Sequence, residues 1–158
     1  MRKAEKEIKD PVLINEILAN AHVGRLGTVG MDGYPIVKPL NFVHSGQYVY
    51  FHSAVEGEKI DNILRDNRVC FEVDVPIRYV KAKGNQCKAS YHYRSIIIKG
   101  RAEIIEDHEE KLMALKALME KYQPEGGYDS FPKEKLAITA IVRIEIGTLA
   151  GKEDIAEP

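Results

Sequence analysis

The chain has 158 residues, and its 23 lysines and arginines nearly balance 24 aspartates and glutamates. This length favours one domain with a core of its own, and the balanced charge gives no reason to expect nucleic acid or an anionic membrane as a partner. The apolar runs are too short to span a membrane, and the first ten residues lack the apolar core of a secretion signal. Two isolated cysteines, Cys70 and Cys87, predict a reduced, cytoplasmic protein without a disulfide framework or a metal site.

The first part of the chain predicts a helix and then a hairpin. Asp10-Pro11, followed by VLINEILANA, is typical of a helix with an N-cap and a first-turn proline. Two extended runs then flank Asp32-Gly33, a frequent hairpin turn. Pro35 and Pro39 interrupt the second run, which favours an edge strand or an interrupted ladder.

The stretch from Tyr48 to Asn67 combines a strand, a turn and a helix. Residues 48–52 are aromatic and β-branched, and residues 58–66 carry apolar side chains at helical spacing. Ser53, Gly57 and Lys59 lie where the chain enters the helix. A helix N-terminus favours anions, and a hydroxyl and an ammonium beside it would strengthen that preference. The stretch is therefore a candidate phosphate cradle.

A simpler interpretation of the same stretch is also open. Lysine on a helix surface is usually a solvated charge, and serine and glycine are ordinary turn residues. The G-x-x-x-x-G-K-[ST] spacing of a Walker-type loop is missing.

The rest of the chain completes an α+β domain dominated by β-structure. Residues 76–90 lack a period and predict a loop of functional character, with a short strand at 78–81. Cys70 falls in an apolar strand and is expected to be buried. We predict a single domain over 1–158, with a core at 10–152, a polar tail at 153–158, and six antiparallel strands closing into a barrel with flanking helices. The further elements are strands at 68–75, 91–106 (with a bulge at Gly100) and 137–146, and a helix at 107–122 with Asp107 and Glu110 as a capping pair.

Several motifs together resemble a known family. FHSA-x-x-G-x-K at 51–59 is followed by Y-R-S at 93–95, with PLNFV at 39–43 before them and AGK at 150–152 after them. This order is similar to the FMN-binding split-barrel flavoproteins related to pyridoxamine 5′-phosphate oxidase, in the branch that includes the nitroimidazole-resistance proteins. The resemblance covers about residues 11–152. It implies a six-stranded split β-barrel.

The resemblance also implies a cofactor and a partner: a homodimer with FMN at the subunit interface. Ser53 and Lys59 would hold the phosphate, while His52 and Ala54 would line the flavin pocket. The remaining residues that the resemblance implies are Pro39, Leu40, Asn41 and Phe42 along the isoalloxazine ring; Tyr93, Arg94 and Ser95 from the other subunit or beside the same pocket; and Lys152 in a segment closing over the cofactor.

The leading functional hypothesis is an FMN-dependent oxidoreductase that passes electrons from NAD(P)H to a small organic acceptor, such as a nitro-aromatic. His52 is the candidate catalytic residue, because histidine exchanges protons near neutral pH. The chain ends in LAGKEDIAEP, without the Arg-x-His-type motif of pyridoxamine phosphate oxidases proper, so that specific activity is not expected. One alternative is a non-catalytic flavin- or haem-binding module with His52 or His92 as an axial ligand. A second is an interaction domain without a cofactor.

Overall fold

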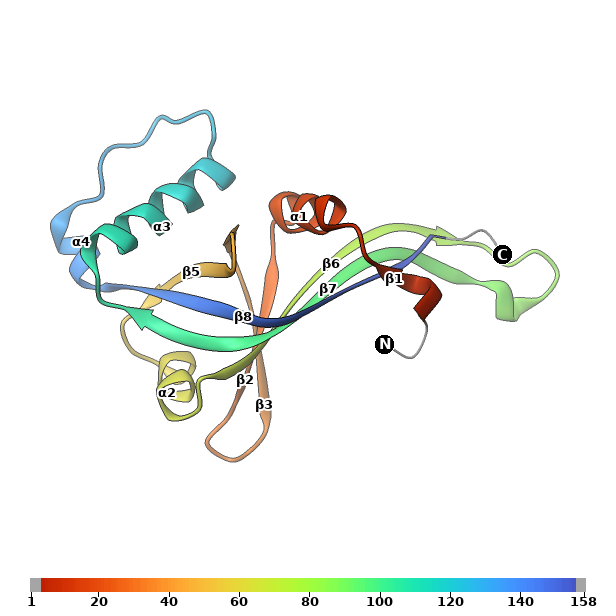
Figure 1. The fold of residues 1–158 in the computed structure, drawn as a ribbon, viewed down its shortest axis with the longest axis horizontal. Helices are drawn as coiled ribbons and strands as arrows, with labels where there is room; N and C mark the ends of the chain where they lie inside the picture. Colours follow the sequence, from red (N-terminus) through yellow and green to blue (C-terminus); the bar gives the residue numbers. More distant parts are fainter. Residues whose placement is uncertain (1–3, 156–158) are drawn as a thin grey trace.

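The computed structural model describes residues 4–155 of the chain, which form one strongly curved antiparallel sheet with helices around it (Figure 1). The fold is α+β and dominated by β-structure, as predicted. The strands are β1 (Glu7–Ile8), β2 (Gly24–Val29), β3 (Pro35–Leu40), β4 (Val43–Ser45), β5 (Tyr48–Ala54), β6 (Arg68–Val80), β7 (Ser90–Ile105) and β8 (Thr139–Asp154). The helices are α1 (Pro11–Asn20), α2 (Glu58–Arg65), α3 (His108–Tyr122) and α4 (Lys133–Ala137), with short 3-10 turns at Ala4–Lys6 and Gln86–Lys88.

The sheet has the form of a split barrel. Its order is β3-β2-β6-β7-β8-β5-β4, with β1 added to β8, so the two outermost strands are β3 and β4. These edges follow each other in the chain and are joined by residues 41–42. The prolines of β3 therefore lie on an edge strand, where a missing N–H leaves no ladder bond broken on the open side. Asp32-Gly33 forms the predicted β2–β3 turn, with Gly33 at φ +86°.

The strand number and two boundaries differ from the prediction. The sheet has eight strands rather than six, because the very short β1 and β4 carry little sequence signal. Residues 76–80 continue β6 and pair with β7, so the predicted 76–90 loop is reduced to a turn over 81–89. The last strand also runs beyond 146 to Asp154, because β7 offers it a partner along its whole length. Part of the predicted tail is therefore strand, and 156–158 lie outside the described residues.

These long strands form an arm that extends from the barrel (Figure 1). The tip of the β6–β7 hairpin lies at one end of the molecule, and α2, α3 and α4 lie toward the other end. Register shifts near Pro76 and at Gly100 interrupt the ladders, and the bulge at Gly100 was predicted. Within residues 4–155, none of the helices has the length and apolar character needed to cross a membrane.

The core follows the alternation of the strands. Phe71 is fully buried and meets the Phe42 ring edge-to-face at a centroid distance of 5.0 Å. Gly24 leaves room for this ring, because a Cβ there would lie 2.1 Å from the Phe71 Cζ atom. Cys70, between the inward-facing Val69 and Phe71, points outward and is exposed. The prediction that Cys70 is buried was wrong, because an apolar neighbourhood in the sequence does not determine which face of a strand a residue occupies.

Caps and buried polar pairs fix the helices. The Asp10 carboxylate accepts the Val12 N–H at 2.9 Å, and Asp107 accepts the Glu110 N–H at 2.8 Å, so both predicted N-caps are confirmed. The Glu110 side chain does not return to the cap. It accepts hydrogen bonds from the Tyr50 hydroxyl (2.9 Å) and the Arg143 guanidinium (2.8 Å), which ties α3 to β5 and β8.

Helix α2 packs on the barrel with a different face from the one expected. Its Ile60 and Ile63 are buried as predicted, but Leu64 is 71% exposed. Asn62 takes the inner position and donates to the Thr28 hydroxyl at 3.1 Å. A buried amide is stable there because the hydroxyl satisfies it.

Candidate functional site

The residues predicted to form a phosphate cradle line a hollow of about 350 Å³ between the end of β3 and the start of α2, which we call the cradle. Ser53 enters it from β5, and Lys59 from the first turn of α2. Gly57 precedes the helix with φ +118°, a conformation that favours glycine, and no side chain caps the helix there. The first amides of α2 therefore have no intrahelical acceptor. The hollow is lined by Lys38, Pro39, Ser53, Glu56, Gly57, Glu58 and Lys59.

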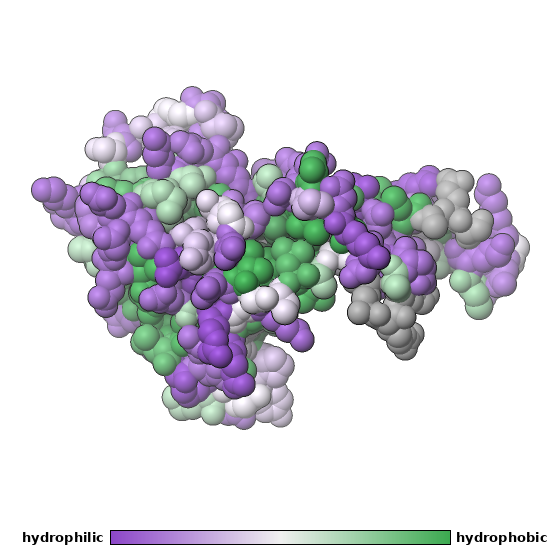
Figure 2. All heavy atoms as spheres, viewed as in Figure 1, coloured by the Kyte–Doolittle hydropathy of each residue, from purple (hydrophilic) through white to green (hydrophobic). Residues whose placement is uncertain are grey.

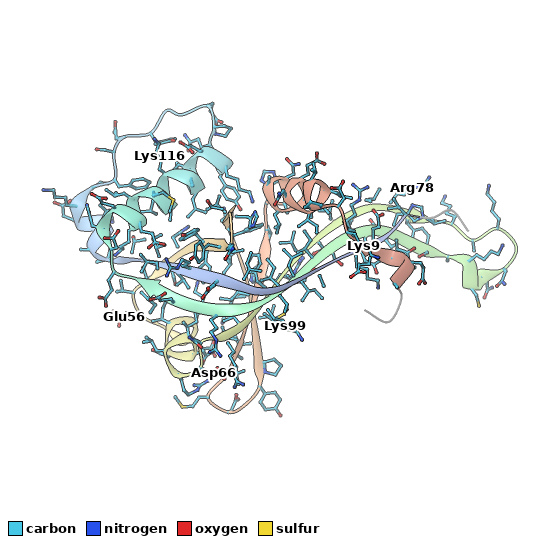
Figure 3. The ribbon with its side chains drawn as sticks, viewed as in Figure 1. Lys9, Glu56, Asp66, Arg78, Lys99 and Lys116 are labelled. Carbon is cyan, nitrogen blue, oxygen red and sulfur yellow. The ribbon has the colours of Figure 1, made fainter. Side chains whose placement is uncertain are left out.

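Lys59 is the distinctive charge of this cradle. Its ammonium is half-buried, 5.2 Å from the centroid of the Phe51 ring, and none of residues 4–155 forms an ion pair with it. Burial, followed by the positive charge of Lys38, lowers the pKa of Lys59 below its ordinary value. Lys38 is itself paired with Glu58 at 2.8 Å, and Glu56 lies exposed at the rim (Figure 3). A bound anion would relieve the cost of burying the unpaired Lys59 charge.

The segment predicted to follow the isoalloxazine ring divides into two parts. Pro39 and Asn41 are exposed, while the Phe42 side chain is fully buried in the core. The Phe42 N–H donates to the Tyr122 hydroxyl (3.0 Å), which lies 3.1 Å from the Phe42 carbonyl and 2.8 Å from the His22 carbonyl. Both backbone groups of Phe42 are thus engaged by α3. Phe42 and the half-buried Leu40, which packs against the core, can support the segment from beneath, while Pro39 and Asn41 remain to face a ligand.

His52 lies on the other face of β5 from Ser53, as strand alternation requires. It lines an apolar cavity of about 280 Å³ between β5, α3 and α4, which we name the helix pocket. Ala54 is exposed at the end of the same strand. The helix pocket is lined by Asn41, His52, Leu115, Leu118, Met119, Tyr122, Phe131, Lys135, Leu136 and Thr139.

The remaining predicted residues lie on the arm, away from the cradle. On β8, Ala140 pairs with Ser53 and Lys152 pairs with Ser95. Ala140 and Lys152 are therefore twelve residues apart on β8, which is about 40 Å along an extended strand. Figure 3 likewise shows Glu56 and Arg78 toward opposite ends of the molecule, Glu56 near α2 and Arg78 on the arm. Within one chain, the arm residues therefore do not flank the cradle.

The arm residues make local contacts instead. Arg94 pairs with Glu153 at 3.1 Å, and the Lys152 ammonium lies 5.4 Å from the centroid of the Tyr93 ring. Ser95 is half-buried. His92 is only 4% exposed and accepts the Arg78 Nε–H at 3.4 Å, with its side chain on the opposite face from Tyr91 and Tyr93.

Sequence reasoning missed two basic residues near the candidate site. Lys38 reaches the cradle only because the end of β3 meets α2 in space, and no local motif signals that contact. Lys121, at the end of α3, lies with its Nζ atom 3.7 Å from the centroid of the Phe42 ring and donates to the Leu18 carbonyl at 2.9 Å. Its place in the last turn of a helix is ordinary for a lysine and gave no signal.

The lowered pKa of Lys121 predicts that the stability of the protein depends on pH. Burial lowers its pKa from 10.5 to about 8. Between these values the unfolded chain holds a proton that the folded chain has released, so stability should rise with pH across that window. We expect a gain of about 1 kcal/mol relative to Lys121→Met, after allowing for solvent screening of a half-exposed group. Urea unfolding of the wild type and of Lys121→Met at pH 8 and 10.5 measures this gain in the free energy of unfolding. The same change with pH in both proteins would contradict the prediction.

Taken together, the curved sheet, its split edge and the cradle define a split-barrel protein with a hollow at the barrel end, in which no carboxylate of residues 4–155 pairs with the Lys59 ammonium. The chain belongs to the pyridoxamine 5′-phosphate oxidase family, whose family model matches residues 13–153. A search of curated proteins gave no match.

Solved structures share this fold over most of their length. A candidate 5-nitroimidazole antibiotic resistance protein from Bacteroides thetaiotaomicron is 28% identical, with a TM-score of 0.82 over 93% of this chain and 86% of that one. The flavocytochrome Anf3 from Azotobacter vinelandii is 21% identical, with a TM-score of 0.88 over 100% and 73%. A FAD- and heme-binding protein from Mycobacterium smegmatis is 19% identical, with a TM-score of 0.79 over 97% and 75%. These similarities agree with the predicted split barrel and its branch.

Proposed function

We propose that the protein is an FMN-dependent oxidoreductase that passes electrons from NAD(P)H to a small organic acceptor. One observation carries the proposal: the half-buried Lys59 has no carboxylate partner within residues 4–155, and it lies beside Ser53 at an uncapped helix N-terminus. A phosphate monoester supplies the negative charge and the acceptor oxygens for which Lys59 and the first amides of α2 have no partner among these residues.

The comparisons support a flavin cofactor as the molecule whose phosphate binds in the cradle. Among the proteins with this fold are a flavocytochrome, a FAD- and heme-binding protein and an F420 reductase. FMN suits this cradle because its phosphate is terminal and carries two negative charges near neutral pH, whereas the phosphates of FAD lie within the molecule.

The side chains would divide the work between binding and proton transfer. When bound, FMN supplies the hydride chemistry, accepting two electrons from the nicotinamide and releasing them to the acceptor. Lys59 and the Ser53 hydroxyl would hold the phosphate, and Pro39 to Asn41 would position the ring. From the adjacent face of β5, the His52 imidazole would donate a proton to the reduced acceptor.

The activity is tested by turnover of the FMN-loaded protein with NADH or NADPH and a nitro-aromatic acceptor. His52→Ala should lower kcat by about 100-fold, the lower end of the effect of a general acid, while FMN retention remains unchanged. His108→Ala is the matched control, because His108 is exposed at the start of α3 and lies outside the helix pocket. Wild-type kinetics in the His52 variant would reduce this residue to a structural role.

We also propose that the flavin site is shared between two copies of the chain. Tyr93, Arg94, Ser95 and Lys152 lie too far along the arm to reach their own cradle, so only a second copy could place them there. Figure 2 shows apolar residues reaching the surface near the middle of this face of the molecule. Ile97 of β7 is also exposed, with 44% of its surface accessible to solvent. An exposed apolar area at the centre of a face is typical of a protein interface.

Light scattering should therefore give twice the chain mass of 17.8 kDa. Ile97→Lys should shift the protein toward the monomer and reduce FMN retention at the same time, because the interface and the site depend on each other. Lys99→Ala changes the same strand at an exposed residue and should do neither. A wild-type monomer with full FMN content would contradict the shared site.

A further inference from the structure

The helix pocket is separate from the cradle, and phosphate binding in the cradle does not account for it. It is a cavity of about 280 Å³ next to the cradle, and five of its ten lining residues are leucine, methionine and phenylalanine side chains from α3, α4 and the segment between them. We propose that the helix pocket binds the electron acceptor, and that the acceptor is a compact, uncharged ring compound with one hydrogen-bond-accepting oxygen. This inference rests on the proposed function.

Strand alternation connects the pocket to the cradle. In β5, Ser53 faces the cradle and the preceding His52 faces the helix pocket. A second segment also passes from one site to the other, since Pro39 in β3 lines the cradle and Asn41, just after the strand ends, lines the pocket. Two short segments thus contribute to both sites. A cofactor held by its phosphate in the cradle and extended along Pro39 to Asn41 would bring its ring to the mouth of the helix pocket.

The lining selects against charge. Among the described residues, none of those lining the helix pocket carries a carboxylate, so a cationic ligand would lose its hydration without gaining a partner. The Lys135 ammonium is exposed to solvent and leaves the walls around it apolar, so a full negative charge would be poorly solvated inside. A neutral, largely apolar molecule has no charge that must be solvated inside the pocket, so it avoids both penalties.

The free polar groups of the pocket are suited to a single acceptor oxygen. The Tyr122 hydroxyl is used by the backbone at Phe42 and His22, and the Thr139 hydroxyl donates to the Lys135 carbonyl at 2.8 Å. The Asn41 amide and the His52 imidazole remain to donate to a ligand. A carbonyl or nitro oxygen placed between them would be bound by the same His52 that supplies the proton.

The size of the pocket limits the ligand to about one ring. Drug-sized ligands occupy pockets of about 300–1,000 Å³, and this one lies just below that range. It cannot enclose a dinucleotide, so NAD(P)H would have to reach the flavin from outside the pocket. Donor and acceptor would then be distinguished by size and charge.

Two methionines on α3 provide a direct test by NMR. Met119 lines the pocket, whereas Met113 on the same helix is 44% exposed and does not. In FMN-loaded protein with ¹³C-methyl-labelled methionine, acetophenone should shift the Met119 signal saturably and leave the Met113 signal in place. The 1-phenylethylammonium ion has the same carbon skeleton with a positive charge instead of the carbonyl, and it should bind at least about tenfold more weakly, the effect of about 1.4 kcal/mol.

Two tryptophan variants locate the binding site. Leu136→Trp should fill the pocket and abolish the Met119 response, while Ile138→Trp, at a residue 57% exposed and outside the lining, should preserve it. The comparison of the two ligands on the wild-type protein needs neither variant, so the test survives a folding defect in Leu136→Trp.

FMN content is measured on the same samples, so that the two proposals can fail separately. Retained FMN without a Met119 response, or equal binding of the ketone and the ammonium ion, would overturn the acceptor pocket and leave the proposed function standing. A Met119 response that persists in a folded Leu136→Trp protein would place the ligand elsewhere and would also overturn it. A protein that retains no FMN would overturn the proposed function, and with it the assignment of this pocket to an electron acceptor.

Discussion

Replacing Lys59 with alanine is expected to weaken FMN binding by about 10- to 150-fold. A charge-assisted hydrogen bond contributes about 1.5–3 kcal/mol, and each 1.4 kcal/mol changes affinity tenfold. We expect the contact between Lys59 and the phosphate to contribute a free energy in this range, because Lys59 is half-buried and no carboxylate in the described part of the chain pairs with it. Its charge is therefore available to the phosphate. Quenching of flavin fluorescence on titration measures the Kd.

Lys116→Ala is the matched control for this change. Lys116 is a helical lysine on the outer surface of α3 (Figure 3), with only a loose 3.9 Å contact to Glu120. Its removal should leave the Kd for FMN unchanged. Lys59→Arg should retain most of the affinity, because a guanidinium also binds phosphate well. Equal Kd values for Lys59→Ala and wild type would show that the cradle does not hold the cofactor.

The largest effect on stability is expected from Phe71→Ala, which should lower the free energy of unfolding by about 3–5 kcal/mol. Phe71 has no solvent exposure, packs on the Phe42 ring and fills the space that Gly24 leaves open. Its loss would create a cavity beneath the segment that carries Asn41. FMN retention should therefore fall as well, since the ring-side wall of the site rests on this packing.

Cys70→Ala provides the comparison from the neighbouring position. Cys70 points outward from the same strand, so its replacement should change stability by no more than about 0.5 kcal/mol. Urea unfolding of both variants gives the two values. Similar losses at both positions would contradict the assignment of inner and outer faces on β6.

Local signals in the sequence were sufficient for much of the fold. The Asp10 and Asp107 caps, the Asp32-Gly33 hairpin and the bulge at Gly100 each depend on residues close in the chain, and all are present. The edge position of β3 followed from its prolines. These features need no tertiary information, because a cap, a turn or a missing donor acts within a few residues.

The wrong boundaries all depend on partners distant in sequence. Residues 76–80 and 147–154 have weak patterns of their own and are strands because β7 pairs with both of them. Ile141 shows the same limit. By strand alternation it shares a face of β8 with Thr139, Arg143 and Glu145, yet α3 packs on that face, and Ile141 is fully buried beside Leu115. Which face of a strand meets a helix depends on tertiary packing.

The candidate site was only partly predictable for the same reason. Ser53, Gly57 and Lys59 lie within seven residues of one another, and the structure brings them together in one hollow. Lys38 joins them through the contact between β3 and α2, and the helix pocket exists only because α3 and α4 cover β5. The arm residues remain a prediction for a second copy of the chain.

The most direct test of the account is the absorption spectrum of the purified protein before and after FMN is added and the excess removed. Flavin bands should remain after the excess is removed, at a ratio approaching one FMN per chain. A Soret band in place of them would indicate a haem-binding module. A colourless protein that retains no FMN would contradict the central claim that the cradle at Ser53 and Lys59 binds a flavin phosphate.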